Sequence, residues 1–298
     1  MTTWADELAT AEAALEAGDA AGAAAAARRG DALAEKPAQA ATTRRVLGDA
    51  LLLGGDQHGA RKAYDEALEM TADLPTRHPV RALVRNSMGA LARGRGELDA
   101  ADGHFSAALD SELGETPQYR VGLLLSLAGL AQARGDLVDA EAQTKEALAL
   151  EIKMRGHQSA GACAAGGQLG ALISALGRHE EAIEILAEVT ENLQTLYGRQ
   201  HNEVGIAFCT LGAALDRAGR GEDAEAAYRR GLGVREAVVG PDQPELAATL
   251  LNLGRILDRN GDRAGGRALA ERAVRNLEGR VVPDHPFLVT ARRRVEAG

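Results

Sequence analysis

The side chains best suited to chemistry in this sequence are seven histidines and two cysteines, residue types that often bind zinc. Their spacing does not form a metal site, because no HxH, HxxxH or CxxC pattern occurs and Cys163 and Cys209 stand far apart. His78, His201 and His285 begin HP or HN pairs at points where a helix would start, which is a usual place for a polar residue. We therefore predict that the protein binds no metal.

Carboxylates offer a second route to chemistry, through acid and base catalysis. The sequence has no phosphate-binding GxxxxGK[ST] loop, no GxGxxG between a strand and a helix, and no GxSxG nucleophile motif. Asp216, Asp258 and Arg255 could still converge on a small molecule. An accessory enzyme that uses these carboxylates stays open as an alternative, but we expect a protein that is not an enzyme and needs no cofactor.

The balance of charges bears on the class of partner. The formal net charge is −9 and the pI is about 5.4, whereas a site for nucleic acid or for an anionic membrane needs a basic surface. The first residues are acidic where a secretory signal would be basic, and no apolar run approaches membrane-spanning length. We expect a cytoplasmic protein that binds neither nucleic acid nor membrane.

A repeated ten-residue pattern organises the second half of the chain. It reads LAGLAQARGD from residue 127, LGALISALGR from 169, LGAALDRAGR from 211 and LGRILDRNGD from 253, so each copy starts 42 residues after the previous one. Similar features recur upstream at intervals of 37 to 41 residues. The predicted units cover approximately residues 4–35, 38–73, 79–113, 117–155, 159–198, 201–240 and 243–281, and a capping helix follows at 285–297. We predict one continuous array over residues 1–298.

Each unit has the pattern of a helix hairpin, because apolar and small residues recur at helical spacing on both sides of a turn that contains glycine. We expect the turn glycines to adopt the left-handed backbone conformation that ends a helix. They are Gly18, Gly55, Gly96, Gly135, Gly177, Gly219 and Gly261. A second glycine, in the LG pair of the first helix, lets the second helix approach closely. One hairpin cannot bury its apolar faces alone, so we predict an all-α protein built as a solenoid of stacked antiparallel hairpins.

These residues resemble the tetratricopeptide repeat, in which an LG pair, a turn glycine, an alanine and an aromatic residue follow one another as Gly212, Gly219, Ala224 and Tyr228 do here. The 42-residue units, with openings such as HNEVGIAF and the ending YRRGLGVREAVVGPD, resemble the repeats of kinesin light chains and their bacterial relatives. The resemblance implies a right-handed superhelix whose first helices line a concave groove that binds peptides or protein partners. Fold alone does not fix function.

The resemblance also indicates which residues face this groove, counted from the LG glycine of each first helix. The candidate binding residues are Arg45, Asp49, Asn86, Arg93, Ser126, Gly167, Gln168, Thr210, Asp216, Asn252, Arg255 and Asp258. They describe a groove with charged ends and a small, nearly neutral middle. No groove position is lysine, so a clamp for a C-terminal carboxylate of the kind found in chaperone-binding arrays is not expected. Only Asn252 keeps the asparagine that contacts peptide backbone in light-chain repeats.

The segment SAGACAAGGQLG at residues 159–170 has almost no side chains, although the repeat places it in a helix. Gly161, Gly166 and Gly167 have no role in the repeat pattern, and each costs about 1 kcal/mol of helix stability relative to alanine. The glycines either open a pocket for a bulky group of a ligand, or are tolerated because neighbouring side chains fill the space. The sequence leaves both interpretations open.

These observations favour a non-catalytic scaffold or adaptor that binds a protein or peptide in the concave groove. A sensor that binds a small molecule or a signal peptide at the glycine-rich centre of the groove is the main alternative. The patterns do not identify the partner, and self-association into a homo-oligomer stays open as well.

Overall fold

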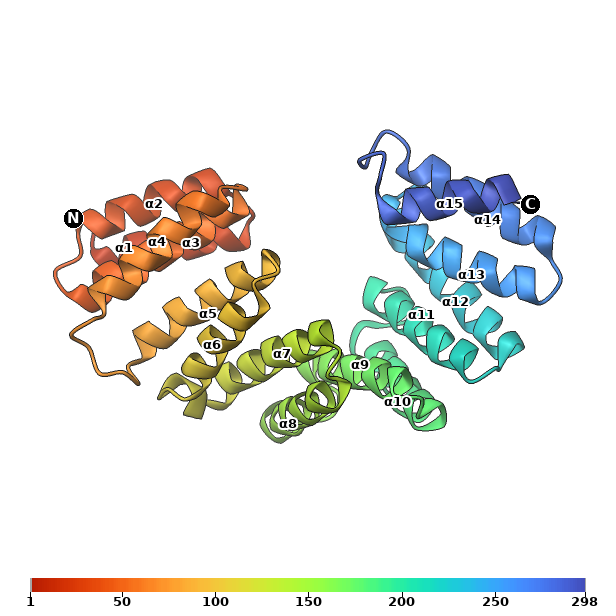
Figure 1. Cartoon of the computed structure of the whole chain (residues 1–298), viewed down its shortest axis with the longest axis horizontal. Helices are drawn as coiled ribbons and strands as arrows, with labels where there is room; N and C mark the ends of the chain where they lie inside the picture. The colour runs from red at the N-terminus through yellow and green to blue at the C-terminus, as the bar shows by residue number, and fades with distance from the viewer. Residues whose placement is uncertain (1, 298) are drawn as a thin grey trace. The chain divides into compact units, whose positions relative to one another are not determined.

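The computed structural model describes residues 2–297, which fold into fifteen α-helices and two short 3₁₀ helices without a strand (Figure 1). The α-helices are α1 (Trp4–Glu16), α2 (Ala20–Ala32), α3 (Pro37–Leu53), α4 (Gln57–Met70), α5 (Pro79–Gly94), α6 (Leu98–Leu109), α7 (Pro117–Arg134), α8 (Leu137–Arg155), α9 (Ala160–Ala175), α10 (His179–Tyr197), α11 (Asn202–Arg217), α12 (Gly221–Val239), α13 (Ala247–Arg259), α14 (Arg263–Leu277) and α15 (Pro286–Ala297). The 3₁₀ helices are η1 (Leu113–Glu115) and η2 (Pro244–Leu246). The prediction of an all-α protein is confirmed. In this part of the chain, no helix is both long and apolar enough to cross a membrane.

Consecutive helices pack as hairpins, with α1 against α2, α3 against α4, α5 against α6, α9 against α10, α11 against α12 and α13 against α14. All seven predicted turn glycines have a positive φ, between +76° and +93°. A residue with a side chain is strained in this left-handed region, so a glycine there lets the first helix end and the chain reverse. The prediction for these turns is confirmed.

The glycine of the LG pair lies where the two helices of a hairpin meet. A Cβ atom at Gly212 would come within 2.9 Å of the Tyr228 ring, and one at Gly170 within 2.6 Å of the Leu186 side chain. Tyr228 and Leu186 are each 1% exposed. The glycine therefore makes room for a large side chain of the second helix, as predicted.

Two of the histidines cap helix starts. Nδ1 of His78 accepts a hydrogen bond from the backbone N–H of Val80 at 3.2 Å, and Nδ1 of His201 accepts one from Glu203 at 3.3 Å. The first amides of a helix have no partner within the helix, so these contacts satisfy them. The interpretation of these two histidines as helix starts is confirmed.

The helices form two compact units, unit 1 (Met1–Leu150) and unit 2 (Glu151–Gly298). Unit 1 contains α1 to α7 and unit 2 contains α9 to α15, while α8 runs through the boundary. The core of unit 2 centres on Tyr228, Leu250 and Ile256, none of which is more than 1% exposed. The repeat pattern shows no sign of this division, and one continuous solenoid over the whole chain stays a prediction.

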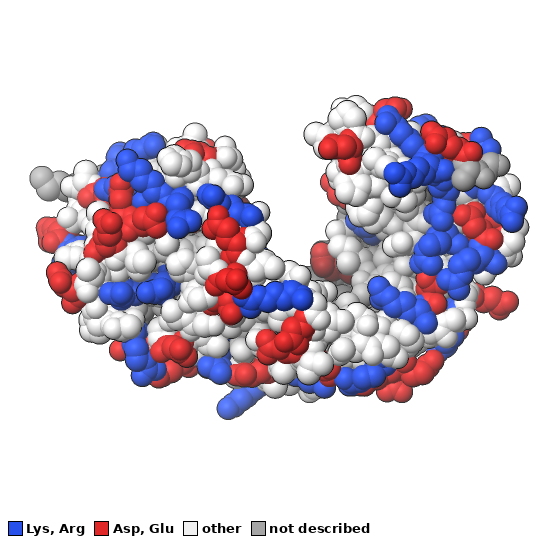
Figure 2. Space-filling model, viewed as in Figure 1, with Lys and Arg blue, Asp and Glu red and all other residues white. Residues whose placement is uncertain are grey.

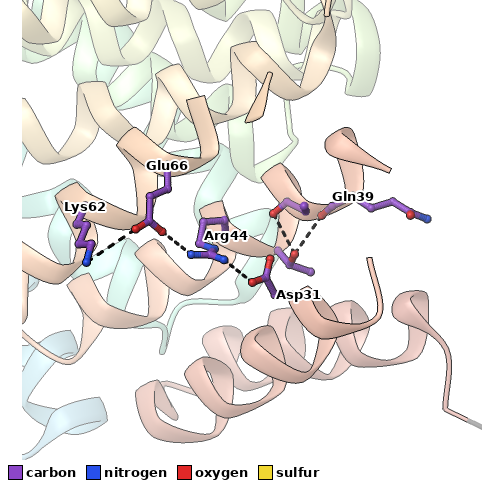
Figure 3. Close-up of polar contacts among 7 residues, drawn as sticks. Asp31, Gln39, Arg44, Lys62 and Glu66 are labelled. Carbon is purple, nitrogen blue, oxygen red and sulfur yellow. Dashed lines mark hydrogen bonds and ion pairs between the residues drawn. The ribbon is translucent and has the colours of Figure 1, made fainter. Parts of the chain in front are cut away.

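Ion pairs join neighbouring helices within unit 1. Arg44 on α3 pairs with Asp31 on α2 and with Glu66 on α4, and Lys62 lies 3.9 Å from Glu66 (Figure 3). These charges satisfy one another, and the side chains of Arg44, Asp31 and Glu66 are all partly shielded from solvent. We interpret the cluster as a link between three helices rather than a reactive site.

Candidate functional site

The glycine-rich stretch of α9 contains two adjacent glycines with different surroundings. A Cβ atom at Gly166 would lie 2.9 Å from Cγ2 of Val189 on α10, so a neighbouring side chain already fills that space. A Cβ atom at Gly167 would meet no such atom within 4 Å. Filled space therefore explains Gly166, whereas Gly167 faces an open space.

Gly167 lines a cavity of about 550 Å³ between α9, α10 and α11. Most of the lining is apolar and includes Cys163, Leu186, Val189 and Ile206. Cavities of this size with apolar walls and few polar groups are typical of ligand sites. We call this the first cavity.

The repeat explains why the first cavity lies beside α9. Residues at the Gly167 position of the next two repeats, 42 and 84 positions later, are Cys209 and Leu251. Leu251 is 6% exposed and belongs to the core of unit 2. A leucine on α9 would project into the first cavity and reduce its volume.

Two partly exposed side chains line the first cavity near its opening. Tyr197 on α10 is 40% exposed and Ile206 on α11 is 38% exposed. The Tyr197 ring stacks on His201 with the ring centroids 4.3 Å apart, which holds the tyrosine in place. Exposed aromatic and aliphatic groups beside a cavity are typical of surfaces that bind a partner.

A second cavity, of about 300 Å³, adjoins the first along α11 and α13. The two cavities share the lining residues Ala171, Leu186, Ile206 and Thr210, so they form one groove, which we call the unit 2 groove. The second cavity is the more polar, and its polar lining residues include Ser174, Arg217, Arg235, Thr249 and Asn252. The groove therefore changes from apolar to polar along its length.

Four of the predicted binding residues line the unit 2 groove. Gly167 and Gln168 belong to the first cavity, Asn252 belongs to the second, and Thr210 lines both. The hydroxyl of Thr210 donates to the backbone carbonyl of Ile206 at 3.1 Å, which fixes its orientation on α11. The structure brings these four residues together, and their role in binding stays a prediction.

Three other predicted residues of unit 2, Asp216, Arg255 and Asp258, line neither cavity. Asp216 is 7% exposed and accepts hydrogen bonds from Arg255 and Arg259, which lie 39 and 43 residues later on α13. Asp258 pairs with Arg294 on α15 at 3.2 Å. These carboxylates link neighbouring helices and are not among the residues that line the two cavities, and their role in binding stays a prediction.

The same pairing bears on the possibility of catalysis. The carboxylates of Asp216 and Asp258 are both paired with arginines. Burial raises the pKa of the Cys163 and Cys209 thiols, which makes them poor nucleophiles near neutral pH. Within residues 2–297, no group of three or more His, Cys, Asp or Glu side chains could hold a metal ion.

The predicted residues of unit 1 also divide between paired charges and a cavity. Arg45 and Asp49 form an ion pair with each other on α3. Asn86 on α5 and Ser126 on α7 line a cavity of about 320 Å³. Arg93 is exposed at the end of α5. The cavity that Asn86 and Ser126 share is smaller than the first cavity of unit 2.

Sequence reasoning missed several residues of the unit 2 groove, because it counted only some positions on the first helices and none on the second helices. Tyr197 and Arg235 come from the second helices α10 and α12, and Thr249 was not among the positions counted on α13. A signal for Arg235 was present in the repeat. The residues 42 positions before and after it are Leu193 and Leu277, so the arginine departs from an apolar position.

Two stretches of unit 2 match family models that are each described as tetratricopeptide repeat, at residues 162–237 and 246–287. These two stretches of the chain are similar to tetratricopeptide repeats. The matched stretches include most of α9 to α14, which carry the unit 2 groove. The resemblance seen in the LG pairs and turn glycines is confirmed.

Solved structures share this tetratricopeptide fold. A tetratricopeptide repeat protein from Parabacteroides merdae is 13% identical, with 97% of this chain and 98% of that chain covered and a TM-score of 0.65. A Rap protein complexed with Competence and Sporulation Factor is 12% identical, with 92% and 76% covered and a TM-score of 0.65. BtubC (BKLC) from P. vanneervenii is 20% identical, with 93% and 91% covered and a TM-score of 0.50. A search of curated protein sequences finds no match.

Proposed function

We propose that this tetratricopeptide repeat protein is a non-catalytic scaffold whose unit 2 groove binds a segment of a protein or peptide partner. The observation that carries the proposal is the first cavity, which is lined by Gly167 of α9 at a position where α13 has Leu251. A helix that gives up stability at a cavity wall is a usual sign of a functional site.

The first cavity is suited to an apolar anchor. A large aliphatic or aromatic side chain that moves from water into apolar surroundings contributes about 1.5–3 kcal/mol. Tyr197 and Ile206 would extend this contact beyond the cavity. Gln168 and Asn252 carry amide groups that would donate to, and accept from, the backbone of an extended segment.

The fold comparison supports a binding role. The similar Rap protein is complexed with Competence and Sporulation Factor, so a protein of this fold holds a separate molecule. At 12% identity the likeness concerns the fold alone. The chemistry of binding must therefore come from the groove residues of this chain.

A sensor for a small molecule is the second candidate. The first cavity favours it, because a volume of about 550 Å³ would hold a compact ligand. A peptide is the better fit to the whole groove, since the first cavity continues into a second, polar one. A compact ligand would leave that second cavity without a role.

We also propose that the scaffold works in the cytoplasm. Cys163 and Cys209 are both free thiols, which suits a reducing compartment. Western blotting of fractionated host cells would test this, and recovery in an extracellular fraction would contradict it.

Selection from a library of short random peptides with amidated C-termini tests the proposed function. Full-length protein, immobilised on beads, should enrich peptides that share a large apolar residue. These peptides should not bind the Gly167→Leu variant, in which the new side chain fills the first cavity. Failure to enrich any peptide would contradict the proposal. A rise in the thermal unfolding midpoint with free amino acids, but with no peptide, would favour the small-molecule sensor.

A further inference from the structure

Arg235 on α12 occupies a position that is apolar in the neighbouring repeats of unit 2. Leu193 lies 42 residues earlier and is 8% exposed, and Leu277 lies 42 residues later and is 1% exposed. A charged side chain at such a position costs free energy unless its charge has a partner. The position of Arg235 therefore requires a polar or charged partner for its guanidinium group.

Two glycines make room for this arginine. A Cβ atom at Gly205 on α11 would lie 2.5 Å from Cγ of Arg235, and one at Gly231 on α12 would lie 2.8 Å from the backbone oxygen of Gly205. The flanking repeats carry Cys163 and Ala247 at the position of Gly205. The glycines thus allow α11 and α12 to cross closely and the arginine to lie along the crossing, so that it lines the second cavity.

The guanidinium group of Arg235 has polar neighbours but no carboxylate. Its Nη1 donates to Oγ1 of Thr249 at 2.9 Å, and its Nε donates to Oδ1 of Asn202 at 3.4 Å. Arg217, the other arginine of the second cavity, donates to Oγ of Ser174 at 3.3 Å. Among the residues that the structure describes, neither arginine forms an ion pair with an acidic side chain, and no Asp or Glu lines this cavity.

The charged side chains that line the second cavity are both arginines, so the cavity carries an excess of positive charge. Asp216 precedes Arg217 on α11, but its carboxylate already pairs with Arg255 and Arg259. Arg217 and Arg235 therefore face the cavity without a counter-charge. Basic side chains are also prominent on the visible face of unit 2 near α13 and α15 (Figure 2).

We propose that the second cavity is a carboxylate subsite, in which Arg235 binds the side chain of an Asp or Glu residue of the peptide. Guanidinium groups bind carboxylates through charge-assisted hydrogen bonds, often with two parallel contacts. Glu203 lines the first cavity, whereas no acidic side chain is among the residues that line the second. The inference rests on the proposed function and deepens it: the ligand carries a large apolar residue and an acidic residue at a fixed spacing.

The library selection, repeated with Arg235→Leu, tests this subsite. Leucine is the residue of both neighbouring repeats at this position, so the variant should fold, and circular dichroism with a urea unfolding curve checks that it does. Because the library peptides are amidated, only side chains supply carboxylates. We expect wild type to enrich Asp or Glu at a fixed distance from the apolar residue, and Arg235→Leu to keep the apolar preference while losing the acidic one.

Affinities of one selected peptide make the test quantitative. We expect wild type to bind the acidic peptide about tenfold more tightly than its Asn or Gln counterpart, because charge-assisted hydrogen bonds are lost in the latter. Arg235→Leu should bind both peptides alike. Arg229→Leu, which alters an exposed arginine on the same helix, is the matched control and should keep the wild-type preference.

Two results would overturn the subsite and leave the proposed function standing. One is an apolar preference in wild type without an acidic one, and the other is an acidic preference that survives in Arg235→Leu. If wild type enriches no peptide at all, the proposed function and the subsite both fail.

Discussion

The first helices α9 and α13 lie two repeats apart in unit 2, and they show how one scaffold is opened or closed. At equivalent positions, α9 carries Gly167 and Ala171 where α13 carries Leu251 and Arg255. Leu251 is 6% exposed in the core and Arg255 is held by Asp216, whereas Gly167 and Ala171 line the first cavity. Large or paired side chains at these positions accompany the filled surface at α13, and small side chains accompany the open groove at α9.

This difference separates the residues that build a repeat from those that give it a function. Turn glycines recur in all seven units and LG glycines in five of them, because they let the chain reverse and the two helices of a hairpin approach. Gly167 and Arg235 do not recur, and both line the unit 2 groove. In a tetratricopeptide array, departures from the repeat are thus the places to look for a ligand site.

Gly167→Leu would break the comparison by making α9 resemble α13. We expect the affinity for a selected peptide to fall by about 100-fold, or roughly 2.7 kcal/mol, because the leucine occupies the place of the apolar anchor. The helix should gain about 1 kcal/mol, since glycine is disfavoured there. Titration calorimetry and urea unfolding measure the two effects.

Gly167→Ala is the matched control for that experiment. Its methyl group takes little of a cavity of about 550 Å³, so it should keep peptide binding while gaining helix stability. Unchanged affinity in Gly167→Leu would show that the ligand binds elsewhere.

Removing both arginines that pair with Asp216 would test the filled surface at α13, which the comparison sets against the open groove at α9. In the Arg255→Ala, Arg259→Ala double variant, a carboxylate that is 7% exposed loses both partners. We expect a loss of about 2 kcal/mol in the free energy of unfolding, less than for a fully buried pair because the arginines are half exposed. Urea unfolding measures it. Arg229→Ala, which removes an exposed pair with Glu225, should change stability by less than about 0.5 kcal/mol, and an equal loss in the two variants would contradict the structural role.

Alanine substitutions at the two adjacent glycines would sharpen the contrast within α9. Gly167→Ala should stabilise the protein by about 1 kcal/mol, since the added methyl group meets open space. Gly166→Ala should gain clearly less, because its methyl group would lie 2.9 Å from Cγ2 of Val189 and force that side chain to move. Equal shifts in the urea midpoint would show that the space beside Gly166 is not filled.

The thiol of Cys163 reports on access to the first cavity, and this is the smallest expected effect. Burial raises its pKa, so the reactive thiolate is scarce near pH 8 and increases as the pH rises towards the shifted pKa. In a Cys209→Ser background, alkylation by iodoacetamide should be slower than for a free cysteine, should accelerate with rising pH, and should slow when a selected peptide is added. Mass spectrometry follows the reaction. A rate that the peptide does not change would contradict occupation of this cavity.

The sequence contained enough information to predict the helices and their pairing. Turn glycines such as Gly219 and close-contact glycines such as Gly212 act within one hairpin, so their spacing carries the signal. The division at Leu150 falls within α8 and was not predictable in this way, because the repeat pattern records contacts within one hairpin.

The candidate site was predictable only in part. Gly167 and Asn252 were identified as groove residues because their places follow from the LG glycine. Asp216 and Arg255 were counted as groove charges, and their pairing could not be foreseen because it joins residues 39 positions apart on different helices. Arg235 was missed because second helices were left out of the count, although its departure from the apolar repeat position was visible.

Photo-crosslinking tests the central claim most directly. A selected peptide, synthesised with a benzophenone amino acid in place of its large apolar residue, is irradiated with the full-length protein and the crosslinked residues are identified by mass spectrometry. We predict crosslinks to the lining of the first cavity, on α9, α10 and α11, and their loss in Gly167→Leu. Crosslinks confined to unit 1 or to α15, or crosslinks that persist unchanged in Gly167→Leu, would contradict the assignment of the unit 2 groove as the binding site.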